Sequence, residues 1–312
     1  MKIFRADETQ FFTDASVTVG TFDGVHCGHR KVLKRLIESA KETGGHSVVF
    51  TFWPHPRVVL GKNDIKLLNT MEEKVLLFEK VGVDAVVIAE FNSDFARITS
   101  YDFVKDYLVG KFRAKNIIVG HDHHFGKMRE GKYETLGNLS KEFGFRLFQV
   151  NAQNVGEQTV SSTKIRRELE AGNIDVANSM LGYAYFFSGK VVEGFRIGKN
   201  LGFPTANIGQ FEPFKQIPGD GVYAVTVKVH GNIYKGMMNI GVRPTIEHNN
   251  HVRSVEVHLF EFNSDIYCEN IIIKVFNRIR NEIEFKNINE LKKQLEIDRG
   301  TALGMLEKVE TV

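Results

Sequence analysis

The sequence predicts an α/β domain with a parallel sheet, followed by a small antiparallel β domain that ends in a helix. Three observations support this α/β plus β organisation. The chain has 312 residues, about the length of two ordinary domains. In its first part, short apolar runs alternate with helical patterns, as in βαβ units. From Gly189 onward, strand alternation is interrupted by turn residues instead.

Four short apolar runs in the first part are interpreted as buried strands: Val17–Val19, Ser47–Phe52, Asp84–Ala89 and Asn116–Val119. Between them, residues 31–40 and 72–81 place apolar side chains at helical spacing. In the first of these helices the apolar side comprises Val32, Leu33, Leu36 and Ile37. Parallel sheets of this kind bind ligands at the carboxyl ends of their strands, where helix N-termini point.

The pattern changes after about Met180. Strand-like runs at Val222–Val229, Ile233–Ile240, Val252–Phe262 and Ile266–Val275 are separated by His230-Gly231-Asn232 or Asn263-Ser264-Asp265. Such turns predict an antiparallel barrel or sandwich. A last helix is expected from Asn289 as N-cap, with Leu291 and Leu295 on its buried face. A boundary near Leu181–Tyr185 divides the chain into domains of residues 1–181 and 182–312.

Composition and charge exclude several classes of protein. Hydrophobic residues make up 42% and charged residues 25%, which excludes a disordered, collagen-like or coiled-coil chain. The formal net charge of +3 is too small for a nucleic-acid coat, although it allows local phosphate pockets. Cys27 and Cys268 cannot form a disulfide framework. Without an apolar signal core or a membrane-length apolar run, we expect a soluble, cytoplasmic protein with no membrane or nucleic-acid partner.

The segment Gly20–His29 lies between the first predicted strand and a helix and has the strongest chemical pattern. Its three glycines allow the backbone to approach a bulky anion. His26 and His29 are three residues apart, so they face the same way at a helix start. Two imidazoles beside a helix N-terminus suit negative charge that builds on a phosphoryl group. A glycine-rich turn with two ordinary histidines is the alternative.

Metal binding is a second interpretation of the same histidines. His26, Cys27 and His29 are all possible ligands, and the run His121-Asp122-His123-His124 could supply others. However, Cys27 points away from a site that both histidines share, and three ligands are normally needed. Cys27 also lacks the neighbours that would make it a nucleophile. A metal-dependent hydrolase and a non-catalytic nucleic-acid-binding protein remain as rival functions at this stage.

Three further segments are expected where strand ends converge. Thr51–Pro56 follows a strand and is either a ligand loop or a turn made rigid by proline. Gly120–Gly126 follows another strand and could place Asp122 near a ligand. Ser161–Arg166 opens a helix, where its hydroxyls can cap the helix or bind phosphate. Arg166 lies one turn beyond Thr163 and offers a bidentate phosphate contact, unless it is a plain surface residue.

The second domain contains a glycine-rich stretch from Gly189 to Asn207. Thr205 and Asn207 are two residues apart, so in extended backbone their side chains point to one side. A hydroxyl and an amide carbonyl are hard oxygen donors that suit Mg²⁺. A loop shaped only by its proline is the alternative. Further along, alternation places Glu256 on the opposite strand face from Val255 and Val257, without deciding which face is inward.

These segments resemble those of a known family. GTFDGVHCGH resembles the HxGH signature of the nucleotidyltransferase superfamily. Followed in order by TFWPHP, GHDHHFG and SSTKIR, it resembles the adenylyltransferase module of prokaryotic bifunctional FAD synthetases. GKVVEGFRIGKNLGFPTAN, MNIGVRPTI and SVEVHLFEF resemble riboflavin kinase motifs, so the resemblance covers nearly the whole chain. One departure is His123, where the family usually has an aromatic or other apolar residue.

The resemblance implies a Rossmann-like nucleotidyltransferase domain followed by a small antiparallel β-barrel kinase domain. It implies that ATP phosphorylates riboflavin to FMN, and that a second ATP adenylylates FMN to FAD with release of pyrophosphate. Glu256 would be the kinase's general base, facing the barrel interior, and His26 and His29 would stabilise the transferred α-phosphoryl group. Thr205 and Asn207 would hold Mg²⁺. The oligomeric state is left open.

The resemblance also implies binding residues for each substrate. The expected nucleotide and phosphate contacts are Gly20, Phe22, Asp23, Gly28, Asp122, Ser162, Thr163, Arg166, Gly189, Lys190, Gly198 and Lys199. The expected flavin contacts are His55, Arg243, Arg280 and Glu282. For the last two, which lie in the segment Ile279–Phe285, a charged surface strand is the alternative.

Overall fold

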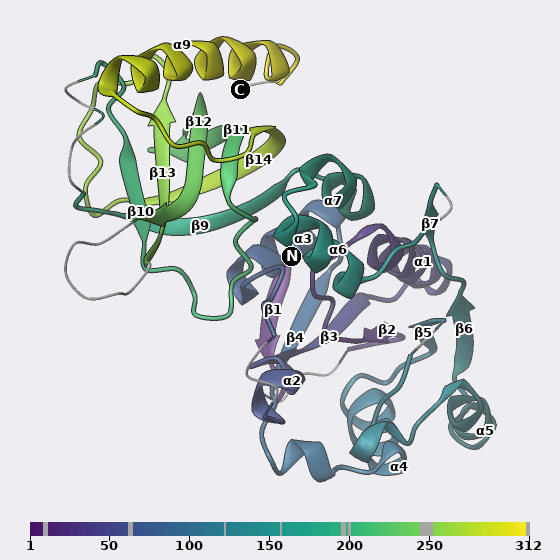
Figure 1. Ribbon diagram of the computed structural model, residues 1–312. Coiled ribbons are helices and arrows are strands. Elements are labelled where there is room, and N and C mark those ends of the chain that lie inside the picture. The colour runs from purple at the N-terminus through teal and green to yellow at the C-terminus, as the bar shows by residue number, and fades with distance from the viewer. Residues whose placement is uncertain are drawn as a thin grey trace. The chain divides into compact units, whose positions relative to one another are not determined.

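The computed structural model describes residues 1–8, 12–61, 65–121, 123–156, 158–194, 198, 201–243 and 252–309. The chain divides into two compact units, residues 1–162 and 163–312 (Figure 1). This division falls before the predicted boundary near Leu181, because helix α7 (Ile174–Leu181) belongs to the second unit. The Asn178 side chain of α7 donates to the Val275 carbonyl at 3.0 Å and accepts from the Tyr185 N–H at 2.7 Å.

The first unit contains the predicted parallel sheet. Its strands lie in the order β1 (Lys2–Arg5), β4 (Ala85–Glu90), β3 (Ser47–Trp53), β2 (Ser16–Val19), β5 (Asn116–Gly120) and β6 (Arg146–Val150). All neighbouring pairs are parallel. The four predicted strands are confirmed, whereas β1 and β6 were not predicted. Both are edge strands with partly exposed residues, so neither has a continuous apolar run.

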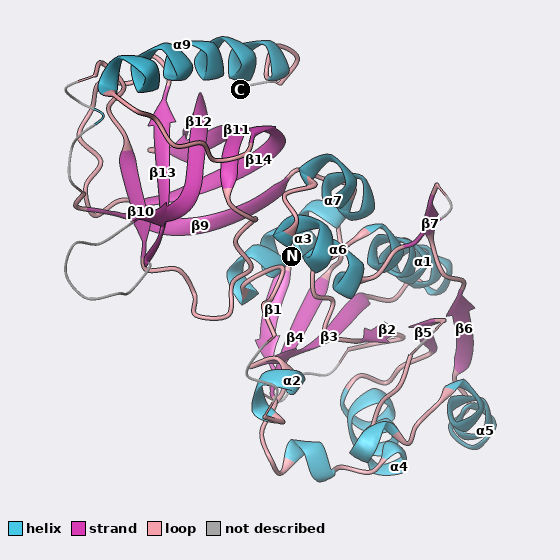
Figure 2. Ribbon diagram, in the orientation of Figure 1, coloured by secondary structure: helices cyan, strands magenta, loops and turns pink. Residues whose placement is uncertain are grey.

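Helices and short turns connect these strands (Figure 2). The helices are α1 (Cys27–Thr43), α2 (Pro56–Val59), α3 (Met71–Val81), α4 (Ser100–Asp102), the π-helical segment η2 (Phe103–Lys111) and α5 (Tyr133–Phe143). The short elements are the 3₁₀ turns η1 (Phe95–Arg97) and η3 (Lys127–Arg129), and a hairpin of β7 (Asn154–Val155) and β8 (Gln158–Thr159). Both predicted helices, α1 and α3, are confirmed. A capping box between Thr70 and Glu73 fixes the start of α3.

The second unit opens with α6 (Ser162–Glu170), whose first residue belongs to the first unit, and α7. An antiparallel barrel follows, with strands β9 (Tyr185–Val192), β10 (Ala206–Gly209), β11 (Gly221–Val229), β12 (Asn232–Arg243), β13 (Val252–Leu259) and β14 (Asn270–Arg280). It closes in the order β10-β13-β12-β11-β14-β9 (Figure 2). This settles the choice between barrel and sandwich, since a closed sheet leaves no edge strand unpaired.

The C-terminal helix α9 (Ile288–Met305) packs on the outside of the barrel. Its Ala302 lies in one apolar cluster with Ala224 of β11 and Met237 of β12. The predicted N-cap Asn289 is wrong. Asn287 caps the helix instead, because its side-chain oxygen accepts the N–H groups of Asn289 and Glu290. Within the described ranges, no helix has both the length and the apolar character that a membrane crossing requires.

Candidate active sites

The first candidate site lies at the carboxyl edge of the parallel sheet. Strand β2 is hydrogen-bonded to β3 on one side and to β5 on the other, so the segments that follow these three strands start side by side. The strand order reverses between β2 and β5, the point at which open α/β sheets bind ligands. Gly20–His29 follows β2 there. His121 follows β5, and the predicted Asp122 lies outside the described residues.

The predicted histidines form a stacked pair at the start of α1. His26 is the N-cap, and its Nδ1 accepts the backbone N–H of His29 at 3.3 Å. The two rings lie 3.6 Å apart between centroids and are nearly parallel, with 14° between their planes. The edge of the buried Phe22 ring packs against His29, with centroids 5.2 Å apart. Both imidazoles are therefore held in fixed orientations.

Burial keeps His29 neutral. It lowers the pKa of His29 well below the ordinary value of 6.5, and the neighbouring His26 and Lys74 lower this pKa further. The Nδ1 of His29 is buried and has no hydrogen-bond partner among the described residues. A neutral imidazole offers one donor and one acceptor. His29 therefore supplies a directed hydrogen-bonding group rather than a positive charge.

Asp23 fastens the turn to two distant segments. It is 2% exposed, and its Oδ1 accepts the backbone N–H groups of Leu68 at 2.9 Å and Asn69 at 3.3 Å. Its carbonyl accepts the hydroxyl of Ser162, the first residue of α6, at 2.8 Å. The predicted Ser162 thus lies on the Gly20–His29 turn although 139 positions separate it from Asp23. Thr163 and Arg166 follow in the first turns of α6.

Sequence reasoning did not identify Lys74, a buried lysine beside this turn. Lys74 is 2% exposed, and its Nζ donates to the Thr21 carbonyl at 2.8 Å. Burial lowers its pKa from 10.5 to about 8, against the opposing effect of Asp23. One sequence feature could have identified Lys74. It lies at helical spacing from Met71 and Phe78, so it falls on the buried, apolar side of α3.

The other predicted residues of the first unit have structural contacts. Gly20 donates its N–H to the Phe50 carbonyl at 3.0 Å, and Gly28 lies in the first turn of α1. His55 is buried and caps α2, with its Nδ1 accepting the N–H of Arg57 at 3.1 Å. In the described part of the chain, no three His, Cys, Asp or Glu residues are grouped to bind a metal. Neither Cys27 nor Cys268 forms a disulfide.

The second candidate site lies on the barrel and joins three predicted residues. Glu256 of β13 lies directly opposite Asn207 of β10 and Asn239 of β12. Residues opposite one another on adjacent strands share a face of the sheet. The hydroxyl of Thr205 donates to Glu256 Oε2 at 3.1 Å. Thr205, Asn207 and Glu256 are therefore neighbours in the structure.

The predicted inward orientation of Glu256 is wrong. Val255 and Val257, which alternate with it, are 4% and 0% exposed and point into the barrel. Glu256 is half-buried on the outer face, the same face on which Phe260 packs near α9. The interior is filled with apolar side chains, where a carboxylate would lose its hydration without compensation. On the outer face the carboxylate keeps access to water and to hydrogen-bond donors.

The loop that precedes β10 is anchored to the same face. His258 donates from Nδ1 to the Pro204 carbonyl at 2.7 Å, and its ring packs against Phe203. Burial lowers the pKa of His258, which favours the neutral ring. The Asn207 amide lies over Gly194, where an added Cβ would come within 2.0 Å of Nδ2. These contacts fix the backbone on both sides of Thr205.

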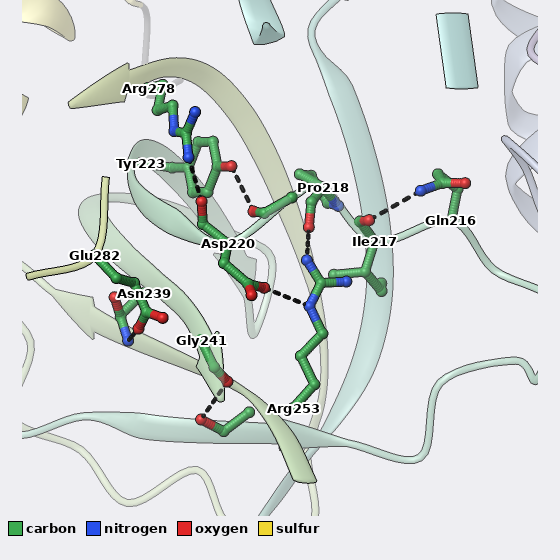
Figure 3. Close-up of polar contacts among 12 residues, drawn as sticks. Gln216, Ile217, Pro218, Asp220, Tyr223, Asn239, Gly241, Arg253, Arg278 and Glu282 are labelled. Atoms are coloured by element: carbon green, nitrogen blue, oxygen red, sulfur yellow. Dashed lines mark hydrogen bonds and ion pairs between the residues drawn. The ribbon is translucent and has the colours of Figure 1, made fainter. Parts of the chain in front are cut away.

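The predicted flavin residues of the second unit lie at or just after the ends of β12 and β14. Glu282 is exposed and accepts from Asn239 Nδ2 at 3.3 Å (Figure 3). Its carboxylate covers Gly241, where a Cβ would come within 1.7 Å of Oε1. Arg280 makes a bidentate ion pair with the buried Asp298 of α9. Arg243 ends β12, and its side chain lies outside the described residues.

A polar network surrounds the loop before β11 (Figure 3). Arg253 donates to Asp220 Oδ1 at 2.7 Å and also to the Pro218 carbonyl. Arg278 donates to the Asp220 carbonyl, and Tyr223 donates to the Gly219 carbonyl at 2.5 Å. Sequence reasoning did not identify these residues. They hold the loop before β11 against β13, which carries Arg253, and against β14, which carries Arg278.

The remaining predicted nucleotide contacts lie on β9 and in the loop after it. Gly189 is buried, and an added Cβ would come within 2.5 Å of the Ile208 side chain. Lys190 follows it on β9 and is half-buried. The Gly198 carbonyl accepts the N–H of Phe203 at 2.9 Å. Lys199 lies outside the described residues.

Comparisons with known proteins agree for both units. Residues 8–164 match the family model for FAD synthetase, and residues 181–306 match that for riboflavin kinase. The bifunctional riboflavin kinase/FMN adenylyltransferase of Bacillus subtilis is 36% identical, with 92% of this chain and 91% of the relative covered. The Haemophilus influenzae protein of the same name is 38% identical, with 92% of each chain covered.

A solved structure has the same fold throughout. A crystallised Streptococcus pneumoniae protein, described as a macrolide-efflux protein, superimposes with a TM-score of 0.88 at 28% identity. The match covers 97% of this chain and 99% of that one. Two family models and full-length relatives therefore lead to one conclusion. The chain belongs to the bifunctional riboflavin kinase/FMN adenylyltransferase family.

Proposed function

We propose that this chain converts riboflavin to FAD in two ATP-dependent transfers, one at each candidate site. Residues 182–312 carry the riboflavin kinase, and residues 1–181 carry the FMN adenylyltransferase. The observation that supports this division best is that each unit has its own polar arrangement. In the second unit, Thr205 is hydrogen-bonded to Glu256, which lies opposite Asn207. In the first unit, the rings of His26 and His29 are stacked. Each is a separate arrangement suited to phosphoryl chemistry. The substrates are small molecules, and we place the reaction in the cytoplasm.

In the kinase step, Glu256 acts as general base. It accepts the proton of the riboflavin ribityl hydroxyl as that oxygen attacks the γ-phosphorus of ATP, and ADP leaves. The half-buried carboxylate is oriented by the Thr205 hydroxyl. Glu282, with Arg243 and Arg280 on the neighbouring strand ends, is assigned to flavin binding. Gly189, Lys190, Gly198 and Lys199 are assigned to the nucleotide.

Mg²⁺ is the proposed metal of this step, held by Thr205 and Asn207. The donor set fits, because a hydroxyl and an amide carbonyl beside a carboxylate are hard oxygen groups. The glycine at position 194 leaves room for the Asn207 amide at this place. The ion would neutralise charge on the nucleotide phosphates. Thr205 and Asn207 would also fix the nucleotide relative to Glu256.

In the adenylyl step, a phosphate oxygen of FMN attacks the α-phosphorus of ATP and pyrophosphate leaves. Such a transfer needs mainly positioning and charge stabilisation. His26 and His29 donate hydrogen bonds to the transferred phosphoryl group, on the turn that contains Gly20, Phe22, Asp23 and Gly28. Ser162, Thr163 and Arg166 bind the triphosphate from α6, with Asp122 in the loop after β5. His55 is assigned to the flavin.

The direct test is chromatography of riboflavin, ATP and Mg²⁺ incubated with the full chain. We expect FMN to form first and FAD to follow, with FAD formed directly when FMN replaces riboflavin. Omission of Mg²⁺ in the presence of EDTA is the control for the metal. Absence of both products with folded protein and excess Mg²⁺ would contradict the proposed function.

A further inference from the structure

Lys74 is a buried cation to which the adenylyl step described above gives no role. It is 2% exposed, and the described residues offer its ammonium one hydrogen-bond acceptor, the Thr21 carbonyl at 2.8 Å. Burying an ammonium is costly unless it is paired and fully hydrogen-bonded. An apolar side chain at this position of α3 would pack against the same core at lower cost. The lysine therefore needs an explanation beyond packing.

The surroundings of Lys74 connect it to the histidine pair. The turn after β2 presents the Thr21 carbonyl and the Asp23 carboxylate, and α1 presents His29, whose pKa Lys74 lowers. From β3, the Trp53 ring centroid lies 5.9 Å from Nζ. On its own helix, Glu73 accepts the Thr70 N–H in the capping box.

Charge at this turn does not come from His29. The pKa of His29 lies well below 6.5, so this ring is neutral at physiological pH. The transferred α-phosphoryl group nevertheless gains negative charge as the bond to FMN forms, and fixed positive charge would stabilise it. Lys74 is the buried cation that interacts electrostatically with both Asp23 and His29.

We propose that Lys74 is a positioning residue for adenylyl transfer. Its ammonium holds the Thr21 carbonyl, and with it the turn that presents His26 and His29 to the α-phosphoryl group. The Lys74 ammonium also provides a fixed positive charge beside that turn, which the neutral His29 ring does not. This inference rests on the proposed function of the first unit.

The test compares Lys74→Met and Lys74→Arg with wild type, measuring FAD formation from FMN and FMN formation from riboflavin on each protein. For Lys74→Met we expect the kcat of FAD formation to fall about 100-fold, with little change in the KM for ATP. FMN formation is the internal control and stays unchanged. Lys80→Met, which removes an exposed lysine from the same helix, is the matched control and keeps both activities.

The pH profile separates positioning from a purely structural role. Wild-type FAD formation should decline above about pH 8, where the Lys74 ammonium loses its proton. Lys74→Arg retains its charge and should move this decline to higher pH, while Lys74→Met should lack it. Thermal unfolding of Lys74→Met checks that the variant is still folded at the assay temperature, so that a lower rate of FAD formation is not a loss of folded protein.

Three results would overturn the inference. One is a Lys74→Met protein that makes FAD at nearly the wild-type rate. The second is a wild-type rate of FAD formation that shows no decline with rising pH up to the ordinary lysine pKa of about 10.4, a measurement that needs neither variant to fold. The third is a Lys74→Arg profile that coincides with that of wild type. A wild-type chain that makes no FAD from FMN would instead contradict the proposed function itself.

Discussion

The Thr205 hydroxyl donates a 3.1 Å hydrogen bond to the Glu256 carboxylate across 51 positions of sequence. The bond joins the loop before β10 to the middle of β13. It orients one carboxylate oxygen while Asn207 and Asn239 flank Glu256 on the adjacent strands. The hydrogen bond therefore links the loop directly to the strand at the candidate kinase site.

Replacing Thr205 by valine should impair the kinase. Valine keeps the shape of the side chain but removes the hydroxyl that orients Glu256 and is proposed to bind Mg²⁺. Because hydrogen bonds to charged groups contribute about 1.5–3 kcal/mol, we expect FMN formation to slow at least about tenfold. Thr205→Ser keeps the hydroxyl and should retain most activity. Equal rates for the valine and serine variants, measured at several Mg²⁺ concentrations, would contradict this role.

Gly241→Ala should displace Glu282. An added Cβ would lie within 1.7 Å of Glu282 Oε1, so the carboxylate must leave its contact with Asn239. If Glu282 binds flavin, the KM for riboflavin should rise while the KM for ATP changes little. Gly300→Ala in α9, where nothing lies within 4 Å of an added Cβ, is the matched control. An unchanged riboflavin KM in Gly241→Ala would remove the support for Glu282 as a flavin ligand.

Arg280→Met should destabilise the second unit. The Arg280 guanidinium makes bidentate bonds to Asp298, which is 1% exposed. Removing one partner of a buried pair leaves an uncompensated charge and typically costs about 3–5 kcal/mol. Urea unfolding followed by circular dichroism should show this loss, and Arg280→Met/Asp298→Asn should recover much of it. If Arg280→Met unfolds at the same urea concentration as wild type, the pair has no stabilising role.

Acidification should destabilise the first unit through His29. Burial holds its folded-state pKa well below 6.5, whereas the unfolded chain keeps the ordinary value. Below about pH 6.5 the unfolded chain therefore binds a proton that the folded chain does not, so stability falls as pH falls. Compared with wild type, His29→Gln should lose less stability between about pH 7.5 and 5.5 in urea unfolding. An identical loss in both proteins would mean that His29 is not the group responsible.

The sequence predicts the elements whose residues are buried on a regular period. Strands β2, β3, β4 and β5, helices α1 and α3, and the barrel strands β11 and β12 all follow such patterns. The edge strands β1 and β6 lack them, since their side chains are partly exposed. The N-cap of α9 was misplaced by two residues because Asn287 and Asn289 are both good capping residues. Only the backbone geometry distinguishes them.

The residues of the candidate sites also fall into those that local sequence patterns predict and those that they do not. The spacing of three residues at a helix start predicted that His26 and His29 lie together. The spacing of two residues in extended backbone predicted that the side chains of Thr205 and Asn207 point to the same side of the chain. Contacts between distant segments could not be predicted, such as Ser162 on Asp23 or Asn239 beside Glu256. Alternation along β13 separates Glu256 from Val255 and Val257, but it does not determine which of the two strand faces points into the barrel. Lys74 gave only the weak signal of a charged residue on an apolar helix face.

The most direct test of the division of labour is product analysis of Glu256→Gln and His29→Ala, separately and mixed, by chromatography. Glu256→Gln should make no FMN from riboflavin but should still make FAD from supplied FMN. His29→Ala should accumulate FMN, and a mixture of the two variants should restore FAD formation from riboflavin. If either folded variant loses both activities, or if His29→Ala stops riboflavin phosphorylation, the assignment of one transfer to each unit is wrong.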